Sequence, residues 1–133
     1  MKNFFVSTLL IFALGNLCHF GLPWWGIVPI AFVVAFLFPQ SGFGAFTAGF
    51  LAGLLLWGVN AILLNAANGG DFAGKIGQIF QGLSSTQLLY ATGFMGGLLA
   101  AFGALTGQWA KDLTVKQLEK DYYQRRRRSG KYY

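Results

Sequence analysis

Few side chains in the first 110 residues could carry chemistry. The fully charged ones there are Lys2, Asp71 and Lys75. His19 is the only histidine and Cys18 the only cysteine, so the sequence excludes a Cys-based zinc site and an internal disulfide. A lone imidazole without a carboxylate or thiolate beside it seldom binds a metal or acts as a general base. We therefore expect no catalytic residue, no metal, no cofactor and no enzymatic activity.

The uncharged polar side chains suggest one further candidate, a small polar cluster. His19, Asn60 and Asn65 are expected near the outer ends of their helices, where they could meet. The simpler interpretation is that each hydrogen bonds to a nearby amide or carbonyl group. No Asp, Glu, Lys or Arg lies within the long apolar runs, and ion-coupled transporters and proton pumps usually need such a group. The sequence disfavours both classes and identifies no small-molecule substrate.

Composition and charge distribution indicate a membrane protein. Hydrophobic residues make up 55% of the 133 residues and charged residues 11%, whereas soluble domains carry roughly 25% charged residues. The basic residues gather at the C-terminal end, where residues 111–133 hold eight Lys/Arg and three acidic residues. Because cytoplasmic segments of membrane proteins are enriched in Lys and Arg, we expect this tail in the cytoplasm, at a bacterial inner (plasma) membrane.

Four apolar runs predict four transmembrane helices, at residues 4–20, 24–38, 43–65 and 86–109. The second run has only 15 residues, about 22 Å of helix against a hydrocarbon core of about 30 Å, and it contains Pro29. The first two runs therefore form either a full or a shallow, re-entrant hairpin. More apolar segments follow the first run, so we expect it to be retained rather than cleaved as a signal peptide.

The connection between the last two runs has a helical pattern of its own. Phe72, Ile76, Ile79, Phe80 and Leu83 fall on one helical face, which predicts an interfacial helix at about residues 72–83. The sequence therefore predicts an all-α polytopic membrane protein, a compact bundle of four transmembrane helices at residues 1–110. A basic cytoplasmic helical extension follows at 111–133. With four crossings, both termini lie in the cytoplasm.

Small residues recur at helical spacing in the third and fourth runs. Such stripes let helix backbones approach closely in a bilayer, where hiding apolar surface gives little driving force. One interpretation is packing between these two helices within the chain. Because the fourth run carries two adjacent stripes, a second contact, to a copy of the chain or to a larger partner, is the alternative. The predicted packing residues are Ala45, Gly49, Gly53, Gly93, Gly96, Gly97, Ala100, Ala101, Gly103 and Gly107.

The basic tail is the strongest indication of a partner. Anionic lipid headgroups attract basic side chains near the membrane surface, so lipids are the first expected partner. An acidic protein surface is the second, and RNA of a membrane-bound ribosome is a weaker possibility, because arginine and tyrosine suit phosphate and stacking but are not specific. The residues expected to make this contact are Lys116, Lys120, Arg125, Arg126, Arg127, Arg128 and Lys131.

Two functions fit this pattern. The first is a non-enzymatic accessory or structural subunit that packs on a larger membrane complex through its glycine-rich helix faces. The second is a homo-oligomeric pore or small-solute permeation protein, similar to a holin in size and charge. A pore should carry a polar stripe along a span, whereas the polar groups here lie near helix ends. The accessory function is therefore the preferred hypothesis.

Overall fold

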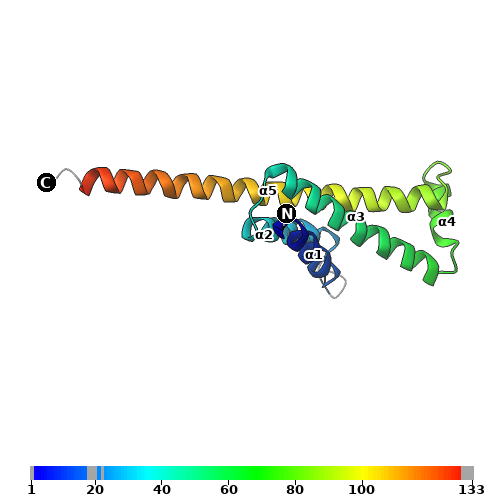
Figure 1. Cartoon of the computed structure of the whole chain (residues 1–133). Helices are drawn as coiled ribbons and strands as arrows, with labels where there is room; N and C mark the ends of the chain where they lie inside the picture. Colours follow the sequence, from blue (N-terminus) through cyan, green and yellow to red (C-terminus); the bar gives the residue numbers. More distant parts are fainter. Residues whose placement is uncertain (1, 18–20, 22, 130–133) are drawn as a thin grey trace.

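In the computed structural model, residues 2–17, 21 and 23–129 are described, and this part of the chain is all-helical and without strands (Figure 1). The all-α expectation is confirmed for these residues. The elements, in chain order, are α1 (Lys2–Leu17), the 3-10 helix η2 (Trp24–Gly26), α2 (Ile27–Leu37), α3 (Gly42–Ala67), α4 (Phe72–Ile79) and α5 (Ser85–Ser129).

Two of these helices are long and apolar enough to cross a membrane. They are α3, with 26 residues, and the first half of α5. By contrast, α1 has 16 residues and α2 only 11. Residues 18–20 of the first predicted span lie outside the described residues. At 1.5 Å per residue, α2 measures about 16 Å, which is short of a full crossing.

One helix boundary differs clearly from the sequence-based expectation. The helix predicted at 72–83 ends at Ile79, because Gln81 and Gly82 adopt φ angles of 61° and 85°, which a right-handed helix cannot contain. The N–H groups of Gly82 and Leu83 both donate to the carbonyl of Gly77 and close the helix. The expected helical extension is confirmed over the described residues, since α5 runs without a break from the apolar segment into the basic tail.

The centre of the fold is α5, which contacts α3, α2 and α4. The first half of the helix carries the contacts with α3 and α2, and α4 lies across the far ends of α3 and α5 (Figure 1). Small side chains let the backbones approach, so that Ala45, Ala52 and Ala100 are completely buried. Ile11 and Ile27 are the largest apolar side chains that are fully enclosed.

The helices α1 and α2 form a hairpin that covers only part of this bundle. At the open end, Asn3 Nδ2 donates a 2.8 Å hydrogen bond to the Pro39 carbonyl, which holds the start of α1 beside the end of α2. At the tip, the Trp24 ring lies 6.5 Å from the Trp57 ring of α3. Since α3 continues ten residues beyond Trp57, to Ala67, it extends about 15 Å past this contact.

Large apolar side chains cover the outside of the bundle. Phe43 is 81% exposed, and Phe5 and Leu9 are each 69% exposed. A water-soluble monomer rarely exposes contiguous apolar surface on this scale, whereas lipid tails solvate it. Further exposed residues of this kind are Leu37, Leu51, Leu55, Ile62, Leu63, Phe94, Met95 and Phe102.

Candidate functional site

Asn60 and Asn65, two of the three residues of the expected polar cluster, form local hydrogen bonds. Asn60 Nδ2 donates to the Leu56 carbonyl of its own helix at 2.7 Å, and Asn65 Oδ1 accepts from the Ala73 N–H at 2.8 Å. The two asparagines are five residues apart on α3, so they point to different sides of the helix. His19 lies outside the described residues. The structure therefore does not bring Asn60 and Asn65 together around one ligand.

Asn65 stabilises α4, because its side chain lies on α3 and caps the N-terminal turn of α4 at the Ala73 N–H. We expect Asn65→Ala to loosen α4 by about 1 kcal/mol, the usual effect of losing such a cap. Hydrogen exchange would show this as faster exchange in residues 72–79, with α3 protected as before. Asn60→Ala is the matched control, because its amide bonds only within α3. Equal exchange of α4 in both variants would contradict the capping role.

Within the described part of the chain, no group of three His, Cys, Asp or Glu side chains is arranged to hold a metal ion. The candidate sites that the structure offers are the glycine stripes, a polar network at the open end of the hairpin, and the projecting half of α5.

The first stripe joins α3 to α5. A Cβ atom built at Gly49 would lie 2.5 Å from the Ala100 carbonyl oxygen, and one at Gly53 would lie 2.8 Å from the Ala100 Cβ and collide with the Gly96 carbonyl. A Cβ at Gly97 would lie 3.0 Å from Phe50, which is a tight contact but less severe than those at Gly49 and Gly53. These glycines allow backbone-to-backbone contact that no other residue permits.

The small residues that continue these stripes along α5, Gly103 and Gly107, form a second stripe that faces α2 of the same chain. A Cβ at Gly103 would lie 2.6 Å from the Val28 carbonyl oxygen, and one at Gly107 would collide with the Phe32 carbonyl. Ala101 is buried as well. The second stripe is therefore covered inside the chain and is not free to meet a copy or a larger partner. The sequence left this open because it could not show where α2 packs.

A polar network that the sequence analysis missed lies at the open end of the hairpin. Gln108, only 2% exposed, accepts the Gln40 N–H through Oε1 at 2.9 Å and donates through Nε2 to Asp112 Oδ1 at 2.9 Å. It thereby ties the turn between α2 and α3 to α5. The available signal was an amide and a carboxylate spaced i, i+4 at the end of an apolar run.

Beyond this network, α5 stands alone. Lys111 Nζ lies 5.0 Å from the centre of the Phe36 ring, and from Asp112 to Arg127 every side chain is exposed. No other labelled element lies beside this half of α5 (Figure 1). Lys116, Lys120, Arg125, Arg126 and Arg127 are thus all exposed; the backbone of Arg128 continues the helix, and Lys131 lies outside the described residues. We call residues 112–129 the arm.

Comparison with known proteins adds no assignment: no family model matches the chain, and no curated protein and no solved structure matches it either. The defining features of the chain are an apolar outer surface and a basic arm.

Proposed function

We propose that this chain is a non-enzymatic integral membrane protein, an accessory subunit that presents a basic helical arm to a larger membrane complex. The exposed apolar surface and the lengths of α3 and the first half of α5 support membrane insertion. In this arrangement those two helices cross the bilayer and α1 and α2 form a shallow hairpin in its cytoplasmic half. Two full crossings put both termini on the same side of the membrane, and the basic tail supports the cytoplasmic side of a bacterial inner membrane.

The observation that carries the proposal is the continuity of α5. From Trp109, at the expected membrane surface, to Arg125 the helix advances 16 residues, or about 24 Å. The Debye length at physiological ionic strength is about 8 Å, so an upright arm holds Arg125 to Arg127 beyond the strong field of the headgroups. Lipid contact is then left to Lys111 and Lys116 near the base, and the arginines suit a protein partner with an acidic cytoplasmic surface.

The pore hypothesis has less support in this arrangement. It requires glycine stripes that pair copies of the chain, whereas both stripes pack against helices of the same chain. The described polar side chains also form no continuous row along α3 or the first half of α5. Asn60 and Thr92, for example, each bond to their own helix.

The test is purification of the full chain from native membranes in mild detergent, followed by mass spectrometry. We expect a larger membrane protein at fixed stoichiometry. Replacing Arg125, Arg126 and Arg127 together by Gln should reduce its recovery at least about tenfold, since ion pairs at such interfaces commonly exceed 1.4 kcal/mol in sum. Val115→Pro keeps every charge but breaks the arm, and should reduce recovery too. Thr114→Ala is the control.

Three results would overturn the proposal. One is a wild-type chain that runs without a partner, whether as a monomer or as a homo-oligomer. A second is unchanged recovery with the triple arginine variant. The third is release of the partner by ribonuclease, which would identify RNA as what the arm binds.

A further inference from the structure

An apolar pocket lies at the end of the bundle that is opposite the arm. It has a volume of about 370 Å³ and opens between the last turns of α3, the first turns of α5, and α4, which bridges the two helix ends (Figure 1). This volume lies in the range of small-molecule sites, about 300–1,000 Å³. Eight of the ten residues that line the pocket are apolar, and the other two are Asn65 and Thr92. We call it the α4 pocket.

The pocket exists because the close contact between α3 and α5 ends before the helices do. Gly58 and Gly93 still lie close together, since a Cβ atom built at Gly93 would be 3.4 Å from the Gly58 Cα. Beyond them, larger side chains line the space, among them Leu64 on α3 and Leu88 and Leu89 on α5. The two helices move apart toward α4, which spans the space between their ends (Figure 1).

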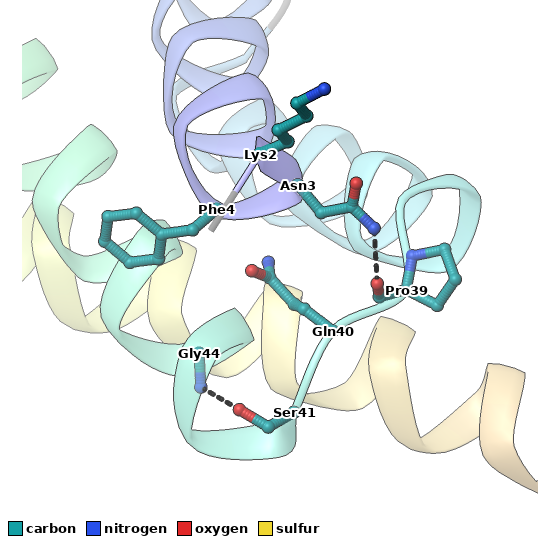
Figure 2. Close-up of a pocket in the computed structure, with 7 residues that line it drawn as sticks. All are labelled: Lys2, Asn3, Phe4, Pro39, Gln40, Ser41 and Gly44. Atoms are coloured by element: carbon teal, nitrogen blue, oxygen red, sulfur yellow. Dashed lines mark hydrogen bonds between the residues drawn. The ribbon is translucent and has the colours of Figure 1, made fainter.

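Water is a poor occupant of the α4 pocket. A buried water needs roughly two to four polar partners, and both polar side chains here are already engaged. Asn65 Oδ1 accepts from the Ala73 N–H, and Thr92 Oγ1 donates to the Leu88 carbonyl. The cavity at the open end of the hairpin is different, because lysine, asparagine, glutamine and serine are among the residues that line it (Figure 2). The α4 pocket instead requires an apolar occupant.

The α4 pocket lies at the depth of lipid acyl chains in the proposed membrane placement. From Trp109 at the cytoplasmic surface, α5 runs back 17 residues, or about 26 Å, to Thr92, and 21 residues, or about 32 Å, to Leu88. The hydrocarbon core is about 30 Å thick, so the pocket lies at its outer edge. The lining side chains of Leu64 and Phe72 are also exposed, so the pocket is open to the surrounding lipid.

The orientation of α4 agrees with an apolar ligand beneath it. Phe72 and Ile76 line the pocket, whereas Lys75 and Gln78 are exposed and do not line it. A helix at a membrane surface takes this orientation, with its apolar side toward the acyl chains and its polar side toward water. Since α4 has only eight residues, too few for a stable isolated helix, its stability depends on contacts made by its apolar side.

We infer that the α4 pocket holds one acyl chain of a phospholipid from the outer leaflet, and that this chain supports α4. The upper part of the chain occupies the pocket, because the pocket lies at the outer edge of the hydrocarbon core. There the chain supplies the dispersion contacts that the lining of an empty pocket would lack. The assignment rests on the proposed membrane placement of α3 and α5.

The test is photo-crosslinking of the full chain in vesicles of phosphatidylethanolamine and phosphatidylglycerol. The probe is phosphatidylglycerol with a diazirine in the upper part of one acyl chain. Leu88 and Leu89 line the pocket and are half-buried, whereas Ile62 and Leu63 are exposed and do not line it. We expect the pocket pair to be labelled at least as strongly as the exposed pair. Labelling of Ile62 and Leu63 alone would overturn the inference without reliance on any variant.

Two alanine-to-phenylalanine variants on α3 form a matched pair. Ala61 lines the pocket, so the new ring in Ala61→Phe takes up space that the acyl chain needs. The ratio of pocket labelling to labelling of the exposed pair should fall roughly tenfold, the factor to which about 1.4 kcal/mol of lost binding corresponds. Ala66→Phe changes an exposed position that does not line the pocket and should keep the wild-type ratio. An unchanged ratio in Ala61→Phe would contradict occupation by a lipid chain.

Two additional measurements separate the alternatives. Pocket labelling in vesicles but not in native membranes would assign the space to an apolar side chain of the partner and overturn the inference. Carbonate extraction of membranes tests the placement separately. A chain released by carbonate contradicts the proposed function, whereas a retained chain with an unlabelled pocket contradicts this inference alone.

Discussion

Replacing Gly53 by alanine is expected to destabilise the bundle by about 1–3 kcal/mol, the usual effect of an extra methyl group in a packed interior. The new Cβ would collide with the Gly96 carbonyl and lie 2.8 Å from the Ala100 Cβ. A backbone carbonyl in a helix cannot rotate away as a side chain can, so α3 and α5 must move apart where they contact each other. The roughly 1 kcal/mol by which alanine favours a helix over glycine offsets only part of this loss.

Gly58→Ala is the matched control, since it makes the same chemical change on the same helix. The nearest atom to a Cβ at Gly58 is the Gly93 Cα, at 3.9 Å, an ordinary van der Waals contact. We expect this variant to be as stable as the wild type or slightly more stable. Unfolding of both variants in detergent with increasing dodecyl sulfate measures the difference. If Gly53→Ala were as stable as Gly58→Ala, the close approach of α3 and α5 at Gly53 would be disproved.

Replacing Gln108 by leucine is expected to have the next largest effect, a loss of about 1–3 kcal/mol. Leucine has a similar volume but leaves the partly buried Gln40 N–H without an acceptor. Asp112 loses a donor as well, but it is exposed and water replaces the bond. The effect should therefore concentrate on the turn between α2 and α3.

Amide exchange gives the direct measurement, because the Gln40 N–H should exchange faster in Gln108→Leu while amides in the middle of α3 stay protected. Gln117→Leu, two turns further along α5 at an exposed position, should change neither stability nor exchange. Unaltered exchange at Gln40 would show that Gln108 does not hold this turn.

The regular elements were readable from the sequence wherever local signals are strong. Ser41 caps α3 through its hydroxyl, and the long apolar run behind it gives a helix from Gly42 to Ala67, close to the predicted 43–65. The end of α4 was misplaced because the apolar period continues through Leu83, whereas the φ angles at Gln81 and Gly82 end the helix. The spacing of apolar residues shows which residues share a helical face, but it does not show where the backbone leaves the helical conformation.

Contacts between distant segments were not readable in this way. The sequence showed that Gly103 and Gly107 form a small face, but only the position of α2 shows what covers it. The same holds for Gln40, whose backbone N–H bonds to Gln108, 68 residues further along the chain. Pairings across such separations depend on the relative depth of the helices, which no local pattern encodes.

The single, unbroken α5 also makes the molecule a lever. The pivot is the base of the arm. There, the Lys111 ammonium packs on the Phe36 ring and the Gln108 side chain hydrogen bonds to the turn between α2 and α3. The part of α5 beyond Lys111 has 18 residues and measures about 27 Å, whereas the part from Ser85 to Lys111 measures about 39 Å. A sideways force on the basic end of α5 would therefore act as a torque on the contact between α3 and α5. At that contact the glycines bring the two backbones so close that little movement is possible.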